Sequence, residues 1–556
     1  MHRKLFTCLM SFFFITFLFS NTLFAQYPPD TTLSKIAVPS VSMPSYLGSI
    51  TDPTFGTTIT RIADQTAFST VMGATYQYNR HGYAKEQPWN ADGSLMFLKY
   101  PRSGSPGIIV DGSTYEIKKT INLPSGAKWS HSDPNKIYGT SGKYFVSSDT
   151  DGNRVWIRNF SEYDSIDIGY GEGNLSDDDR YVVFIAPKTV SGITNYFLIV
   201  YDVTNNLIVS TANIGLIAPD AATISPSGNY VCIIWDEDDG GRNTGVEVFD
   251  RNLNFLRQVE TRSEHGDFGY DTAGNEVFVM LSTKPGESVI SSRLDGGGRM
   301  EMLSGKDVNG GHLSMQNHLR PGWAYISDYE SESPTYWGHD EVLAVKLDGS
   351  GTVERFAHQH HQASKSIYAA QPQAVPNRDG TKVVFASDWD GGNSAPVYSY
   401  VAEKKTGNQV MVITSEGTSG SYGGKQEIVL NRAVNSLTVS GRSKASSVSG
   451  TKGSTYSINV DIQYSDGSTL NQTANFNTGT HGWETTHATI YPTKSIYKVT
   501  VYAYFKNKSG TVWFDDLRVS EDHKEANLLV NPGFDSGTYP LADWVPYGSG
   551  YGLALE

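Results

Sequence analysis

The chain has 556 residues and a formal net charge of -14 at pH 7. With 38% hydrophobic residues, 18% charged residues and 55 glycines, it is typical of many short strands joined by turns, which excludes a disordered or coiled-coil chain. The acidic balance disfavours nucleic acid as a partner, and a polyanionic sugar would need a local basic site.

The N-terminus has the pattern of a secretory signal peptide. A basic start (residues 2–4) precedes an almost wholly apolar run (residues 5–20), and small residues offer a cleavage site after Ala25. A membrane anchor is the alternative, but the apolar run is short for a span. We therefore predict a signal peptide at residues 1–25 and a secreted protein, extracellular or at the cell surface, without a membrane span.

A unit of about forty to fifty residues then recurs along the chain. Each copy has a short strand, a turn rich in Asp, Asn and Gly, and an apolar strand. The seven turn-plus-strand signatures cover residues 87–97, 129–138, 174–184, 223–231, 268–278, 315–325 and 375–385. Such turns join the first two strands of a four-stranded blade, and radial repetition of blades is the β-propeller. The repeats predict an all-β chain with a seven-bladed β-propeller catalytic domain over residues 26–408.

Residues 409–522 differ in composition, because they are rich in Ser, Thr and Gly and contain alternating strands such as 454–464. The pattern predicts a jelly-roll β-sandwich of the carbohydrate-binding type. Residues 512–519 resemble the last strand of galactose-binding-like modules in secreted carbohydrate enzymes. Residues 527–534 resemble the opening of another such module, so we predict residues 523–556 to be the start of a further module or a C-terminal tail.

In a propeller, the start of each innermost strand lies at one mouth of the channel, together with the loops between the second and third strands. Polar side chains gathered in such a concavity are candidates for a site. The candidates, in chain order, are Asn79, His81, Gln87, Arg102, Tyr170, Lys188, Asp220, Arg242, His265, His312, His360 and Gln371. For each of them a hydrogen-bonded loop residue or a solvated charge is the alternative.

Two further patterns bear on ions. Residues 149–153 have a calcium-like spacing of oxygen ligands, for which a tight turn is the alternative. His131 lies beside a turn, which places it at the rim opposite the mouth.

The stretch 81–94, together with His265, His312 and the segment 371–388, resembles the propeller polysaccharide lyases. The resemblance is closest to the ulvan lyases of polysaccharide lyase family 24, with family 25 and the oligogalacturonate lyases as more distant relatives. Oligogalacturonate lyases hold manganese with histidines and a glutamine. His265 and His312 match that pattern, but two further histidines of that family fall on Gln371 and Gln373. The resemblance therefore implies a metal-independent site, with structural ions at most.

The resemblance implies β-elimination on a uronate-containing, ulvan-like polymer. A base removes the C5 proton, the C4–O bond breaks, and cations or hydrogen-bond donors stabilise the developing enolate. An arginine is suited to grip the uronate carboxylate. We assign catalysis to His81, Tyr170, Arg102 and Arg242, and substrate binding to Asn79, Gln87, Lys188 and Gln371. His265, His312 and His360 form the candidate metal site.

No cofactor is required for this chemistry, although the ligand patterns would suit a structural Zn or Ca ion. The expected partner is an anionic polysaccharide, and we expect a monomer. The alternatives are a non-catalytic glycan-binding surface protein and a pectate- or oligogalacturonate-type lyase. A propeller glycoside hydrolase would need two carboxylates at the same mouth.

Overall fold

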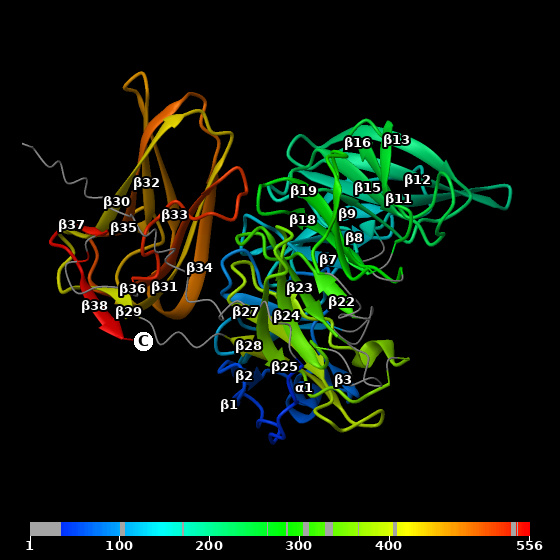
Figure 1. The fold of residues 1–556 in the computed structure, drawn as a ribbon, viewed down its shortest axis with the longest axis horizontal. Helices are drawn as coiled ribbons and strands as arrows, with labels where there is room; N and C mark the ends of the chain where they lie inside the picture. The colour runs from blue at the N-terminus through cyan, green and yellow to red at the C-terminus, as the bar shows by residue number, and fades with distance from the viewer. Residues whose placement is uncertain are drawn as a thin grey trace, which may run out of the picture.

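The computed structural model describes residues 35–555, except for 100–105, 170–171, 264, 285–286, 304–310, 329–336, 365, 404–408, 535–540 and 542. The predicted signal peptide lies outside these residues. The described chain is all-β, with one α-helix, α1 (Gln65–Met72), and one short 3-10 turn, Tyr368–Ala370. Among the described residues, no helix is long and apolar enough to cross a membrane. Figure 1 shows a group of small sheets beside a separate, taller pair of sheets drawn in yellow to red.

The described strands before residue 404 form seven sheets, which we number in chain order. Sheet 1 consists of β4 (Leu95–Leu98), β5 (Gly107–Asp111) and β6 (Ile117–Ile121), and sheet 2 of β7 (Ser125–Trp129), β8 (Lys136–Ser141), β9 (Tyr144–Asp149) and β10 (Arg154–Asn159). Sheet 3 consists of β11 (Tyr181–Val190), β12 (Ile193–Asp202) and β13 (Leu207–Gly215), and sheet 4 of β14 (Ala221–Ile224), β15 (Tyr230–Ile234), β16 (Val246–Asp250) and β17 (Phe255–Glu260). Sheet 5 consists of β18 (Gly266–Tyr270), β19 (Glu276–Leu281), β20 (Val289–Arg293) and β21 (Arg299–Glu301), and sheet 6 of β22 (His312–Ser314), β23 (Trp323–Ser327), β24 (Glu341–Lys346) and β25 (Val353–His358).

Sheet 7 joins distant parts of the chain. It contains β26 (Val375–Pro376), β27 (Lys382–Ser387) and β28 (Val397–Glu403), together with the early strands β1 (Ser49–Thr51), β2 (Thr58–Arg61) and β3 (Tyr78–Asn79). Strand β2 pairs antiparallel with β28, with Thr58 opposite Glu403 and Arg61 opposite Tyr400. The last strand before residue 404 is therefore held by one of the first.

Apolar clusters connect each sheet to the next. The pairs of buried residues that join successive sheets are Phe97 with Trp129, Phe145 with Phe184, Val183 with Trp235, Val248 with Phe278, and Val279 with Ile326. A further cluster contains Tyr325 of sheet 6, Tyr400 of sheet 7 and Met96 of sheet 1. The packing therefore returns from the last sheets to the first, which is the order of a propeller-type fold.

The remaining strands form two five-stranded antiparallel sheets. One has the order β34 (Gly479–Ile490), β31 (Leu437–Val448), β36 (Gly510–Glu521), β29 (Gln409–Ser415) and β38 (Gly552–Leu555). The other has the order β33 (Thr469–Asn475), β32 (Tyr456–Tyr464), β35 (Ile496–Lys506), β30 (Ser421–Arg432) and β37 (Val545–Gly548). A single apolar core that includes Tyr456 and Phe514 lies between them, as in a β-sandwich.

The C-terminal segment corrects one expectation. Residues 523–556 were predicted to start a further module or to form a tail, but β37 and β38 pair with strands of the sandwich itself. Phe534 and Trp544 are fully buried in its core. Burial of these aromatic side chains explains why the segment completes the sandwich.

The sandwich packs against turns of several sheets, which lie before β4 in sheet 1, between β18 and β19 in sheet 5 and between β26 and β27 in sheet 7. The Thr485 backbone N–H donates to Asp92 O at 2.8 Å, and its hydroxyl donates to Asp379 Oδ2 at 2.8 Å. His523 stacks on Tyr270 with ring centroids 4.2 Å apart. These turns therefore face the sandwich, and the starts of β18 and β26, the first strands of sheets 5 and 7, lie at the opposite end of those sheets.

Candidate active site

We use "the open mouth" for the polar residues that precede the first strands, at the end away from the sandwich. Its members are Tyr83, Lys85, Glu172, Asp220, His265, His312, Tyr368 and Gln371. They come from segments before or at the start of the first strands of sheets 1, 3, 4, 5, 6 and 7. The segments are far apart in sequence. They come together because each of them leads into its sheet from the same end of the group of sheets.

Aromatic and imidazole rings form one side of the open mouth. Tyr83 meets His312 edge-on with ring centroids 5.4 Å apart, and Tyr368 does so at 5.8 Å. The rings of Tyr83 and Tyr368 lie 6.1 Å apart, and those of His265 and His312 lie 4.6 Å apart. The structure thus brings together the predicted residues His265 and His312 with two tyrosines that the sequence did not single out.

Hydrogen bonds fix the two histidines. The His312 Nε2 lies 2.6 Å from Gln371 Oε1, and His265 Nδ1 lies 3.0 Å from Gly311 O. Both acceptors are carbonyl oxygens, so each imidazole donates its proton there and keeps its lone pair on the other nitrogen. Burial, reinforced by His265, holds the pKa of His312 well below its ordinary value, so its ring is neutral.

Charged groups form the other side. Lys85, which is 5% exposed, pairs with Glu172 at 2.5 Å between Nζ and Oε2. Burial and the neighbouring Glu172 raise the pKa of Asp220 to about 6. Burial, again reinforced by Glu172, raises the pKa of Tyr83 well above its ordinary value. The open mouth therefore holds a cation, two carboxyl groups and a phenol that keeps its proton.

Arg80 supports this arrangement without being exposed to it. Its guanidinium donates to Ala369 O, Gln371 O and Gln373 Oε1, at 3.2, 2.5 and 2.7 Å. It also donates to Gly82 O at 3.4 Å. Arg80 thus ties the segment after β3 to the segment before β26, and these segments carry Tyr83 and Gln371.

His81, predicted to be catalytic, has a different environment. It is fully buried, its Nδ1 lies 2.8 Å from Ser399 Oγ, and its Nε2 lies 2.8 Å from Gln373 O. Burial, together with the charge of Arg80, lowers the pKa of His81 to about 3. Both ring nitrogens bind the protein interior, so we reassign His81 to a structural role.

Two predicted substrate-binding residues are also used internally. The Gln87 amide donates to Gln316 O and Pro376 O at 2.8 and 3.0 Å, and its Oε1 accepts from the Trp89 N–H. Asn79 is 2% exposed and donates to Tyr76 O at 2.8 Å. These side chains hold strands and loops in place. Of the four residues predicted to bind substrate, the structure places Gln371 at the open mouth.

Arg242 and Lys188 lie away from the open mouth. The Arg242 side chain is 53% exposed, pairs with Glu247 at 2.5 Å, and lies 3.7 Å above the ring of Phe255 on the outer strand β17. Lys188 lies on the long β11–β12 hairpin near the ring of Tyr163. The loop after a second strand can fold outward over the sheet, which the sequence pattern does not specify. Arg102 and Tyr170 lie outside the described residues.

The predicted metal ligands do not form one set. His360 lies after β25, stacks on Trp389 with centroids 4.5 Å apart, and approaches Asp390 rather than the open mouth. His265, His312 and Gln371 remain, and they supply two imidazoles and one amide oxygen without a carboxylate. Manganese prefers oxygen ligands such as carboxylates, so these three residues do not fit it well.

The calcium-like stretch is a turn. The Asp149 Oδ1 accepts hydrogen bonds from the backbone N–H groups of Asp151 and Asn153, both at 2.9 Å. This carboxylate closes its own turn. The alternative reading of residues 149–153 as a tight turn agrees with the structure.

Sequence reasoning missed Tyr83, Lys85, Glu172 and Tyr368 as site residues. Tyr83 and Lys85 lie within or beside the motif 81–94, which was noted because of His81. A lysine in a polar loop reads as an ordinary solvated charge, and its burial against Glu172 becomes visible only when the sheets are assembled.

Comparisons with known proteins give the following likenesses. No protein-family model matches the chain. A stretch of 141 residues is 39% identical to the tRNA nuclease WapA of Bacillus subtilis (strain 168). The aligned stretch covers 24% of this chain and 6% of the nuclease. The tRNA(Glu)-specific nuclease WapA of Bacillus subtilis subsp. natto is also 39% identical over 141 residues, with the same coverage of both chains. The chain thus spans about 6% of the length of the curated relatives it matches.

Among solved structures, an oligogalacturonate lyase in complex with manganese is 14% identical with a TM-score of 0.48, over 66% of this chain and 97% of that one. The oligogalacturonate lyase of Vibrio parahaemolyticus is 10% identical with a TM-score of 0.47, over 64% of this chain and 96% of that one. The activities in these names belong to those proteins.

Proposed function

We propose that this chain is a secreted polysaccharide lyase that cleaves a uronate-containing polymer by β-elimination at the open mouth. The proposal is supported by the grouping of His265, Tyr83 and Lys85, in which the rings of His265 and Tyr83 both contact His312 and Lys85 lies over the ring of Tyr83. They provide a base, a proton donor and a cation, which are the groups that β-elimination needs. In this proposal the seven sheets are the blades of a closed propeller, and the sandwich is a jelly-roll carbohydrate-binding module.

Each group has a defined task. His265 donates its Nδ1 proton to Gly311 O, so Nε2 is the basic nitrogen that removes the C5 proton. Lys85 leaves Glu172 to neutralise the uronate carboxylate, which makes the C5 proton more acidic and stabilises the enolate. Tyr83, whose raised pKa keeps it protonated, gives its proton to the leaving oxygen when the C4–O bond breaks. Gln371, held by the fully buried His312, orients the sugar.

Two predicted residues outside the described part keep their place in the proposal. Arg102 would grip the uronate carboxylate in a bidentate manner, and Tyr170 would serve as an additional proton donor. Tyr170 precedes Glu172 by two residues, which supports its inclusion.

The substrate that we favour is a sulfated, ulvan-like polymer, on the strength of the sequence resemblance around residues 81–94. A pectate- or oligogalacturonate-type polymer is the alternative substrate. Both contain the uronate that the open mouth is proposed to bind, so the assay must include both.

One observation favours a second function. Glu172 and Asp220 are two carboxyl groups at the same mouth, and the pKa of Asp220 is raised to about 6. A glycoside hydrolase uses two carboxyl groups at one site, one of which acts as the proton donor. In that case water, rather than elimination, would cleave the glycosidic bond.

The deciding experiment follows ultraviolet absorbance and reducing ends in parallel, with the purified protein on ulvan and on polygalacturonate. A lyase produces both signals, because each cleavage creates a C4–C5 double bond. A hydrolase produces reducing ends without absorbance, and a non-catalytic glycan-binding protein produces neither. His265→Ala should abolish both signals, whereas the control His481→Ala, in the sandwich, should retain them.

A further inference from the structure

We propose that His131, Asp177 and His318 bind a divalent transition-metal ion, with Zn²⁺ the best match, at the sandwich-covered end of the seven sheets. This site is separate from the open mouth and does not depend on the proposed lyase activity. Its three residues come from sheet 2, the segment before sheet 3, and sheet 6.

The distances suit one small ion. One ligand atom from each residue lies within 4.8 Å of the other two, and His131, Asp177 and His318 are the one such group found among the described residues. His318 Nδ1 is 3.2 Å from Asp177 Oδ1. Ligands at Zn–N and Zn–O distances of about 2.1 Å on a tetrahedral ion lie roughly 3.4 Å apart. The pair is therefore already spaced for coordination, and His131 needs only a small shift.

The donor types also match. Two imidazoles and a carboxylate, with a fourth position for water, are a common zinc ligand set. The Asp177 Oδ1 is buried and makes no aligned hydrogen bond in the structure, which leaves a polar atom that a ligand would satisfy. A cavity of about 270 Å³ lined by all three residues has room for the ion and its water.

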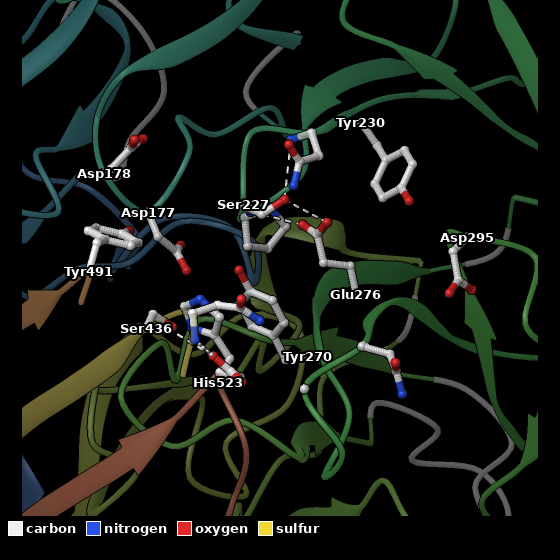
Figure 2. Close-up of a pocket in the computed structure, with 16 residues that line it drawn as sticks. Asp177, Asp178, Ser227, Tyr230, Tyr270, Glu276, Asp295, Ser436, Tyr491 and His523 are labelled. Atoms are coloured by element: carbon white, nitrogen blue, oxygen red, sulfur yellow. Dashed lines mark hydrogen bonds between the residues drawn. The ribbon is translucent and has the colours of Figure 1, made fainter. Parts of the chain in front are cut away.

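The surroundings favour entry of a cation. Next to this cavity lies a second one of about 420 Å³, which shares Asp177 and His523 with it. Figure 2 shows Asp177, Tyr270 and His523 around this second cavity, which sheet residues and sandwich residues enclose together. Its carboxyl groups are those of Asp177, Asp178, Glu276, Asp295 and Asp522, and none of the described residues that line it is a lysine or an arginine. The electrostatic field of these carboxyl groups therefore attracts divalent cations into the second cavity and repels anions.

Arg378 is the competing group. Its Nη1 lies 3.3 Å from His131 Nδ1, while its other nitrogens donate to Asn90 O and Ser130 O at 3.2 Å each. A metal would take the single lone pair of His131 and release this contact. The two carbonyl acceptors would still hold the guanidinium in place. Without metal, Asp177 Oδ1 keeps only its 3.2 Å approach to His318 Nδ1, and the Arg378–His131 contact persists.

The test uses the full chain freed of metal by a chelator and dialysed. Calorimetric titration with Zn²⁺ should give one ion per chain, and Co²⁺ should give the intense visible absorption of a four-coordinate ion. Asp177→Asn and His318→Gln should each weaken binding at least tenfold. Zn²⁺ should raise the Tm of the wild type but not of Asp177→Asn.

Two controls locate the ion. His265→Ala at the open mouth and His361→Ala near β25 should bind Zn²⁺ like the wild type. The proposal is overturned if the wild type takes up no stoichiometric Zn²⁺, or if binding persists in both Asp177→Asn and His318→Gln. Loss of Zn²⁺ binding in His265→Ala or His361→Ala would show that the ion binds near the substituted histidine and not at His131, Asp177 and His318. Circular dichroism of each metal-free variant verifies folding, and the two conservative substitutions act on different sheets, so one misfolded variant does not decide the result.

Discussion

At the residue scale, Asp220 is the carboxyl group at the open mouth whose charge changes near neutral pH. Its pKa is raised to about 6 by burial and by Glu172. Above that pH it is ionised and repels the carboxylate of a uronate, and below it the repulsion disappears. We therefore expect KM for the polymer to rise as the pH increases from 5 to 7, as steady-state kinetics at several pH values would show.

The matched variants are Asp220→Asn and Asp151→Asn, the latter on an exposed turn far from the open mouth. Asp220→Asn should remove this rise in KM, and Asp151→Asn should preserve it. An unchanged pH profile in Asp220→Asn would mean that Asp220 does not face the substrate.

Two histidines that look alike in sequence should respond differently to substitution. His265→Ala should lower kcat by about two orders of magnitude or more, the scale of a lost general base, with an unchanged Tm. His81→Ala removes two buried hydrogen bonds and leaves a cavity, so it should cost about 2–4 kcal/mol of stability and leave kcat nearly intact. Thermal melting and single-turnover kinetics on both variants separate the two effects. A normal Tm together with a greatly reduced kcat in His81→Ala would show that His81 is catalytic, as the sequence predicted.

The same contrast explains what the sequence could and could not predict at this scale. His265, His312 and Gln371 were predicted to share one mouth, because each stands where a first strand begins. His81 satisfies the same positional rule, yet its ring turns inward to Ser399 and Gln373. The position of a residue along a strand is readable from sequence, but the direction of its side chain depends on partners almost three hundred residues away.

At the element scale, the loop after β3 and the segment before β26 are joined through Arg80. Arg80→Lys retains the charge but cannot reach four backbone carbonyl groups and a side-chain amide at once, because lysine lacks the fork of the guanidinium. We expect a lower Tm and a fall in kcat that exceeds any rise in KM, since Gln371 and Tyr83 would be misplaced relative to the reacting bond.

Arg320→Lys is the matched control, since Arg320 is also buried but pairs with Glu354 in sheet 6. It should lower the Tm without a comparable loss of kcat. Equal losses of kcat in both variants would indicate general destabilisation rather than positioning by Arg80.

Local repeats explain why the sheets themselves were predictable. The signatures at 223–231 and 268–278 each coincide with an observed hairpin, β14–β15 and β18–β19, because a turn motif and an apolar strand act over a few residues. The long β11–β12 hairpin and the pairing of β2 with β28 were not predicted. The first has no counterpart in the other repeats, and the second depends on contacts between the two ends of the ring.

At the scale of the whole molecule, the open mouth and the sandwich lie at opposite ends of the seven sheets. A substitution at the junction should therefore affect stability and not chemistry. His523→Ala removes the stacked contact with Tyr270, and we expect it to cost about 1 kcal/mol, with kcat/KM on the polymer unchanged. Differential scanning calorimetry and steady-state kinetics measure the two. A large loss of kcat/KM would show that the junction communicates with the open mouth.

The two-part organisation was visible in the sequence because composition changes near residue 409. The way the parts meet was not, since it depends on turns such as 90–94 and 271–275 and on the shape of the β34 strand that contacts them. Residues 527–534 likewise resembled the opening of a new module, and the buried side chains of Phe534 and Trp544, together with the pairing of β37 and β38, show that the segment finishes the existing one.

The pairing of β2 with β28 also determines how late in synthesis the fold can be completed. During synthesis β2 is made long before β28, so their pairing cannot form until residue 403 has been added. Closing so long a loop is entropically costly and slow. During that interval the bare edge of β2 can pair with another chain. Formation of this pairing is therefore the step that removes an edge open to aggregation from the nascent molecule.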